Sequence, residues 1–243
     1  MLNESRLDEL TEGIERLKNG ALISVLSIVF GIAAFLLLLA VLPHMRFLNI
    51  SLYSNITTMN RTIISIFERK LVGALPYIAV SGLMLILSAI LAIASFVLFF
   101  MATGNLKKYS EKFGIGRIGL IIVLLSMLLV LVAVPSAFLT TGIKHLPSFP
   151  VLMLMTIALV FLSILLSAVG QILFSIMLIR LSEEKDVDEG FRIAGILLAV
   201  SAILIFIPFI SIAGLVLDLV ALILIYTSAK NSLNKLKSGI IVP

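Results

Sequence analysis

Long apolar stretches alternate with short polar segments along the chain, and the longest stretch runs from Ile193 to Ala229. Its 37 residues contain one charged side chain, Asp218, and a proline near the middle, Pro208. A continuous helix of that length would measure about 55 Å, whereas the hydrocarbon core of a bilayer is roughly 30 Å thick. The stretch therefore predicts a helical hairpin that turns at Pro208 on the outer side and carries Asp218 into the middle of its second helix.

Four further apolar runs are long enough to cross a bilayer as helices, since about 18 residues or more suffice. The fold class predicted is therefore all-α, a polytopic membrane helix bundle of six transmembrane helices within residues 21–229. The fifth helix is short, because 15 residues reach only about 22 Å. The predicted spans are Ala21 to Leu42, closed by Pro43; Tyr77 to Met101, entered after Pro76; Ile118 to Leu139; Val151 to Ile179; Ile193 to Ile207; and Ser211 to Ala229.

The segments outside the predicted spans are a leader, an outer loop and a tail. In the leader, residues 1–20, apolar side chains recur at helical spacing and Gly20 is placed to end the helix. We expect an amphipathic helix on the inner membrane face, although a docking surface for a soluble partner needs the same pattern. The outer loop is residues 43–70, and the tail is residues 230–243. The leader's apolar positions are Leu7, Leu10, Ile14 and Leu17.

Composition and charge agree with a membrane location. Hydrophobic residues make up 61% of the chain and charged residues 13%, so the lipid bilayer is its expected surrounding. Zero cysteines exclude disulfides and thiolate metal sites. The basic residues form no stripe with interleaved aromatics, which argues against nucleic acid as a partner. Thirteen Lys and Arg residues fall on one side of the predicted membrane and five on the other, which predicts cytoplasmic termini in a multi-pass plasma-membrane protein.

The outer loop contains three asparagines, Asn49, Asn55 and Asn60, and each opens an N-x-S/T sequon. Three sequons in the loop that the charge count places outside predict an exported and glycosylated loop. A polar loop without sugar is the alternative. Its second half has a helical apolar stripe, which predicts a segment along the outer membrane surface.

Asp218 falls on a predicted seam of small residues in the last span, at the three-and-four spacing of Gly214 and Ala221. Such seams are the usual route to close helix association in lipid. An aspartate at a span centre costs about 3 kcal/mol unless it finds partners. Gln171 in the fourth span is the expected partner, because a protonated carboxyl hydrogen-bonded to its amide satisfies both groups. Two further spans carry seams at seven-residue spacing: Ala74, Ser81, Ser88, Ser95 and Ala102; and Gly119, Ser126, Ala133 and Thr140.

Other motifs predict little chemistry. Gly114, Gly116 and Gly119 match the dinucleotide-binding pattern, but no strand precedes them and a membrane span follows. The acidic loop 183–189 lacks calcium-loop spacing and is typical of a solvated linker. His44 and His145 lack accompanying carboxylates, so neither a metal nor another cofactor is expected. With one carboxylate and no histidine in the spans, the chain is not expected to be an enzyme.

The two ends of the chain resemble a known family. The stretches Glu12 to Leu22 (EGIERLKNGAL) and Ile207 to Gly214 (IPFISIAG) are similar to archaeal multi-span membrane proteins catalogued as domain of unknown function 973. The resemblance implies an archaeal plasma membrane and hydrophobic helices, and it implies no activity and no site residue.

Two functions remain open from the sequence. The first is a non-enzymatic structural or accessory component that associates with other membrane subunits or with itself. In that case Asp218 fixes which helices pair. The alternative is a small cation- or proton-coupled transporter that uses Asp218 with Gln171 as a mid-membrane site.

Overall fold

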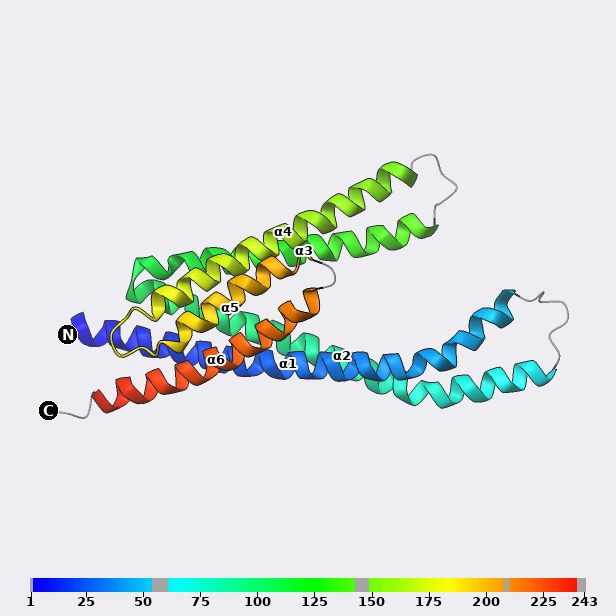
Figure 1. Cartoon of the computed structure of the whole chain (residues 1–243), viewed down its shortest axis with the longest axis horizontal. Helices are drawn as coiled ribbons and strands as arrows, with labels where there is room; N and C mark the ends of the chain where they lie inside the picture. The colour runs from blue at the N-terminus through cyan, green and yellow to red at the C-terminus, as the bar shows by residue number, and fades with distance from the viewer. Residues whose placement is uncertain (1, 54–60, 143–148, 208–209, 240–243) are drawn as a thin grey trace. The chain divides into compact units, whose positions relative to one another are not determined.

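The computed structural model describes residues 2–53, 61–142, 149–207 and 210–239, and Figure 1 shows their helices. Within these ranges there is no strand, so the predicted all-α fold is confirmed. The helices are α1 (Leu2–Tyr53), α2 (Arg61–Tyr109), α3 (Gly114–Gly142), α4 (Phe149–Leu181), α5 (Gly190–Leu204) and α6 (Ser211–Gly239), with a short 3-10 turn, η2 (Glu111–Phe113), before α3.

Five stretches of the described helices are long and apolar enough to cross a membrane. The helix α5 is also apolar but has 15 residues, which is about 22 Å of helix. Many large apolar side chains on these helices are exposed, as expected where lipid replaces water as the solvent. The chain is therefore a polytopic helical membrane protein. The five stretches are Ser5–Ala40, Gly73–Tyr109, Glu111–Ala133, Pro150–Leu181 and Ser211–Ser238.

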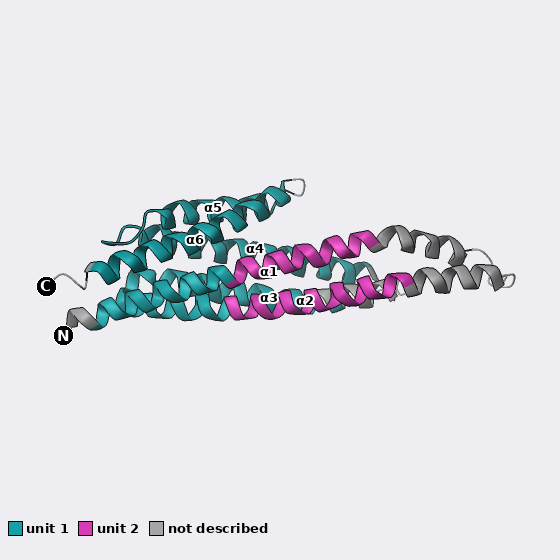
Figure 2. Ribbon diagram, turned by 90° about the horizontal axis from the view of Figure 1, so that it is seen from below, with its two compact units in different colours: residues 1–22, 96–243 teal, residues 23–95 magenta. Residues whose placement is uncertain are grey.

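The chain divides into two compact units, which Figure 2 colours separately. Unit 1 consists of residues 1–22 and 96–243, and unit 2 of residues 23–95. Unit 2 pairs the middle of α1 with α2 through two serines. The Ser27 hydroxyl donates to the Ser88 carbonyl and the Ser88 hydroxyl donates to the Ser27 carbonyl, each over 2.8 Å. Each hydroxyl therefore has a hydrogen-bond acceptor within the protein, which a membrane interior without water requires.

In unit 1, α3 and α4 cross with their backbones in contact at Gly119 and Gly170. A Cβ atom added to Gly170 would lie 2.6 Å from the Gly119 carbonyl oxygen, closer than any side chain permits. Gly116 makes a similar close approach to Met177. Gly116 and Gly119 of the apparent dinucleotide motif therefore serve helix packing.

The helices α5 and α6 form the predicted hairpin, and α5 also packs on α4 (Figure 1). Hydrogen bonds from the Ile210 and Ser211 amides to the Ile207 carbonyl, each 2.9 Å, shape the turn. The predicted cytoplasmic tail, residues 230–243, begins within α6, which continues to Gly239. Ser232, Leu233 and Leu236 are buried in this extension, so packing holds it helical.

The leader also differs from the prediction, because α1 continues through Gly20 without a break. Gly20 lies against Phe99: a Cβ there would be 3.2 Å from the ring, so the glycine allows close packing of α1 on α2. Ile14 and Leu17 are fully buried in unit 1. The apolar stripe of the leader is therefore largely covered by the chain itself, and its place on the inner membrane face stays a prediction.

The first two spans extend beyond their predicted ends. The helix α1 continues past Pro43 to Tyr53, and α2 begins at Arg61 and includes Pro76. The helical backbone thus extends into both ends of the segment 43–70 that was predicted as a loop. Proline removes one backbone donor, and long helices in a bilayer tolerate that loss.

The small-residue seams are buried at most of the positions whose side chains the structure describes, with Ser88 half-buried, which supports their role as packing surfaces. Ser81 and Ala102 in α2, Ser126 and Ala133 in α3, and Ala221 in α6 are all at most 4% exposed.

Candidate functional site, an intramembrane polar cluster

Three helices of unit 1 each contribute one polar side chain to a cluster around Asp218. The amide nitrogen of Gln171, on α4, donates a hydrogen bond of 2.8 Å to Asp218 Oδ1 on α6. The Ser201 hydroxyl, on α5, donates to the same oxygen. Gln171 Nε2 also lies 3.5 Å from Ser201 Oγ. One carboxyl oxygen therefore accepts from two neighbouring helices.

Small residues bring the three helices close enough for these bonds. Gly195 on α5 lies against α4, where an added Cβ would be 2.7 Å from the Ser175 carbonyl oxygen. Gly214 on α6 faces the Ser201 carbonyl, where an added Cβ would be 3.5 Å away. The Ser175 hydroxyl donates to the Gln171 carbonyl over 2.7 Å, so it is satisfied within α4. The cluster thus depends on helix crossings that larger residues would prevent.

The structure brings together the two residues singled out from the sequence, Asp218 and Gln171, and adds Ser201. Sequence reasoning missed Ser201, although it is the single hydroxyl in the run Ile193 to Ile207. A lone hydroxyl in an apolar helix beside a carboxylate is a usable signal, because an unsatisfied hydroxyl is costly in lipid.

Chemically, the cluster can hold a carboxyl group in place and can accept or release a proton. Both donors reach Oδ1, so Oδ2 is the oxygen that is able to carry a proton. Among the described residues, no group of three or more His, Cys, Asp or Glu side chains could hold a metal ion.

For several residues named from the sequence, the structure does not describe the side chain. Pro208, Asn55 and Asn60 lie outside the described residues, as does His145. Asn49 lies in the last turns of α1, where only the backbone is described, and His44 lies in the same region.

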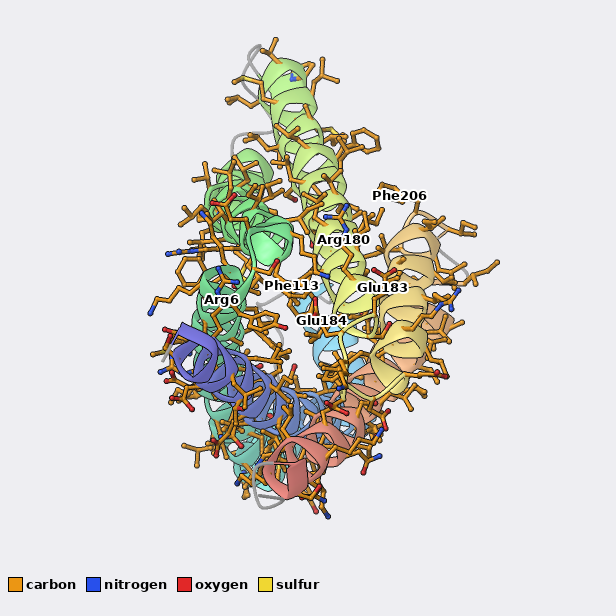
Figure 3. All side chains as sticks on the ribbon, turned by 90° about the vertical axis from the view of Figure 1, so that its left-hand side faces the viewer. Arg6, Phe113, Arg180, Glu183, Glu184 and Phe206 are labelled. Carbon is orange, nitrogen blue, oxygen red and sulfur yellow. The ribbon has the colours of Figure 1, made fainter. Side chains whose placement is uncertain are left out.

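A second set of polar contacts lies at the end of unit 1 that carries both termini, and Figure 3 looks onto this end. Glu184 accepts a hydrogen bond of 2.9 Å from the Tyr109 hydroxyl and pairs with Lys112. Arg180 donates to the Lys112 carbonyl over 3.3 Å. These contacts fasten the α4–α5 connection to η2.

The same connection is fastened to α6 through Asp188. Its backbone N–H donates to Ser232 Oγ over 2.8 Å, and its carboxylate accepts from the Gly190 N–H (2.9 Å) and from Asn231 (3.3 Å). Partial burial opposes ionisation, but the hydrogen bonds to the carboxylate outweigh it and lower the pKa of Asp188 below its ordinary value. The loop expected to be a solvated linker therefore has an anchored residue at its end.

The fold and the cluster define a helical multi-span membrane protein with a polar cluster within its spans. A family model described as "Protein of unknown function (DUF973)" matches residues 10–241, so the chain belongs to this family, and the resemblance at its two ends is confirmed. A comparison with curated proteins found no match, and a comparison with solved structures found none.

Proposed function

We propose that the protein is a non-enzymatic structural or accessory component of a membrane assembly, and that Asp218 is the residue that fixes the pairing of α4, α5 and α6. The observation that carries the proposal is that Gln171 and Ser201 both donate to one carboxyl oxygen. A carboxyl tied to two helices in this way is well suited to specify packing, as single buried polar residues do in other helix bundles.

The residues around the cluster support a structural role over an enzymatic one. An intramembrane hydrolase needs a second carboxylate, a serine with a base, or a metal at the same depth. Asp218 is instead surrounded by an amide, a hydroxyl and glycines that close the helix crossings. In the assembly that we propose, the protein lies in the plasma membrane with cytoplasmic termini and a glycosylated outer segment, and its partners are other membrane subunits or further copies of itself.

The role of Asp218 is tested by three substitutions. Asp218→Asn keeps an oxygen that accepts both hydrogen bonds but cannot carry a proton, so we expect wild-type folding, assembly and phenotype. Asp218→Leu leaves two donors without an acceptor, and we expect a loss of about 1–3 kcal/mol in the free energy of unfolding in mixed micelles. Ser163→Ala is the control, because among the described residues the Ser163 hydroxyl bonds to the Val160 carbonyl of its own helix and to no other helix.

The two candidate functions separate on the Asp218→Asn protein. If it folds and assembles normally but loses a transport-dependent phenotype, the structural proposal is wrong and the proton- or cation-coupled transporter takes its place. The assembly itself is tested by purification from native membranes. We expect a stoichiometric partner or a stable self-oligomer, and a protein that is monomeric and alone in mild detergent would contradict the accessory role.

A further inference from the structure

A cavity of about 620 Å³ lies in unit 1 where α2 ends and α3 begins. None of the residues that line it belongs to the Asp218 cluster. The helix α1 contributes one basic side chain, Arg16, to its lining. Its polar lining is mostly basic, with four cationic side chains, one acidic one and one amide: Arg16, Lys107, Lys108, Arg117, Glu111 and Asn105.

Two of the four cations are already paired. Arg16 pairs with Glu12, and Lys108 pairs with Glu9 over 3.3 Å. Lys107 and Arg117 have no ion pair in the part of the chain that the structure describes. Arg117 is held over the Phe100 ring, with its guanidinium carbon 4.9 Å from the ring centroid. A partly desolvated cation fixed on an aromatic face is pre-organised for an anion, because its geometry is set before binding.

Asn105 gives an independent indication of a ligand. The residue is 7% exposed and lines the cavity, and its amide nitrogen Nδ2 is buried without a hydrogen-bond partner among the described residues. A buried donor without an acceptor is unfavourable and rare in folded proteins. An acceptor oxygen supplied by a bound group would satisfy it.

Free cations and an unsatisfied amide donor around one cavity match the oxygens of a phosphate group, which accept several charge-assisted hydrogen bonds. Phe100 and Met101 add apolar side chains to the lining, and Met101 is 42% exposed. Lys107 and Lys108 follow directly after the apolar stretch of α2, at the depth where a bilayer carries its head groups.

We propose that this cavity binds a phosphate group at the membrane surface, held by Lys107, Arg117 and the Asn105 amide. The phosphate comes from an anionic phospholipid head group or from a soluble phosphate, and one experiment distinguishes the two sources. Phe100 and Met101 favour the lipid, because they offer an apolar wall to the first carbons of an acyl chain.

The experiment uses the absence of tryptophan from the chain. Met101→Trp places a single tryptophan, which can be excited selectively over the tyrosines, in the cavity wall of the full-length protein in phosphatidylcholine nanodiscs. A minor fraction of phosphatidylglycerol with brominated acyl chains should quench this tryptophan more than the same fraction of brominated phosphatidylcholine. Inorganic phosphate is titrated separately, with chloride at equal ionic strength as the reference.

Two further variants in the Met101→Trp background locate the effect. Lys107→Gln with Arg117→Gln should lower the apparent affinity about tenfold, the size of a lost charge-assisted hydrogen bond. The control is Lys230→Gln with Lys237→Gln, which removes the same charge from exposed positions of α6 outside the cavity. Asn105→Leu should also weaken binding while leaving the protein folded, because it removes an unsatisfied buried donor.

Each outcome decides the proposal. Selective quenching by the brominated phosphatidylglycerol that is lost in the cavity variant and kept in the control identifies a lipid site. A saturable response to inorganic phosphate with the same dependence, and without lipid selectivity, identifies a site for soluble phosphate. Equal quenching by both brominated lipids with no phosphate response overturns the proposal, as does an equal loss in the control variant. Unchanged binding in Asn105→Leu would also overturn the proposal, because the buried amide is one of the groups that it assigns to the phosphate.

Discussion

Asp218 and Asp188 are both hydrogen-bonded aspartates, but they lie in different solvents. Asp218 is in an apolar helix, and its hydrogen-bond donors come from the two helices beside it. Asp188 is at the water-exposed end of unit 1, and its carboxylate accepts from the first amide of α5 and from Asn231. At this end the carboxylate is ionised, so its contribution to stability depends on pH.

We predict that Asp188 makes the stability of the protein decrease in acid. Its pKa is lower in the folded chain than in the unfolded chain, where it is about 3.9. The contribution is therefore complete above the unfolded pKa, and it is lost as the pH falls through the folded pKa. When thermal unfolding is measured at decreasing pH across this range, Asp188→Asn should lose less stability than the wild type does.

A matched control lies two residues earlier in the same loop. Asp186 is exposed and has a positive φ of 65°, a conformation that asparagine also adopts readily. Asp186→Asn should therefore keep the wild-type pH profile. An identical flattening in both variants would show that the net charge of the loop, and not the hydrogen bonds of Asp188, causes the effect.

The sequence predicted the pairing around Asp218 but not the cavity at the end of α2, and the reason lies in what helix periodicity can show. The pairing of Asp218 with Gln171 followed from helix periodicity, since each residue lies on a polar or small-residue face of its own span. The phosphate-binding cavity did not follow, because Arg16 and Arg117 are about a hundred residues apart and every basic residue was interpreted only as a topology signal. Periodicity shows which face a residue is on, but tertiary packing decides which faces meet.

At the scale of the elements, helix existence was predictable and helix ends were not. Gly20, Pro43 and Pro76 are ordinary helix terminators in water, and each is inside a continuous helix here. In a bilayer a helix end exposes backbone groups that nothing in the lipid can satisfy, so continuation is favoured. Glycines in these helices therefore mark close crossings more often than ends.

The crossing of α3 and α4 gives the clearest prediction at this scale. In Gly170→Ala the added Cβ would lie 2.6 Å from the Gly119 carbonyl oxygen and 2.7 Å from a Val123 methyl, so the helices must separate. Overpacking of this kind costs about 1–3 kcal/mol, and we expect that loss in the free energy of unfolding in mixed micelles.

Gly82→Ala is the control for this substitution. A Cβ at Gly82 meets no atom within 4 Å, and alanine favours the helix, so its stability should be equal or higher by up to about 1 kcal/mol. If the two variants lose stability equally, helix propensity and not the crossing governs the result. If Gly170→Ala loses none, the contact between the two backbones is not needed for the fold.

At the scale of the whole molecule, membrane depth is the property that connects these elements. The helix α4 has 33 residues, about 50 Å, whereas α5 has 15 residues, about 22 Å. Both begin or end at the 182–189 connection, and the tip of the α5–α6 hairpin stops short of the far ends of α3 and α4 (Figure 1). The tip is apolar and exposed, with Ile205, Phe206 and Ile207 all between 42% and 47% exposed. These features favour a tip that stays within the hydrocarbon core.

We therefore expect Ile207→Cys to be inaccessible to a membrane-impermeant maleimide from either side of intact cells or inverted vesicles, and to react only after denaturation. The wild-type chain has no cysteine, so the labelling has no background. Lys185→Cys, in the 182–189 connection, should react only from the cytoplasmic side, and Ser54→Cys, beside the sequons, only from outside.

Labelling of Ile207→Cys together with Ser54→Cys would show that the hairpin crosses the whole membrane, as the sequence alone predicts. Labelling of Lys185→Cys from outside would invert the orientation, and the phosphate-binding cavity would then lie on the outer surface, because Lys107 and the 182–189 connection belong to the same end of unit 1.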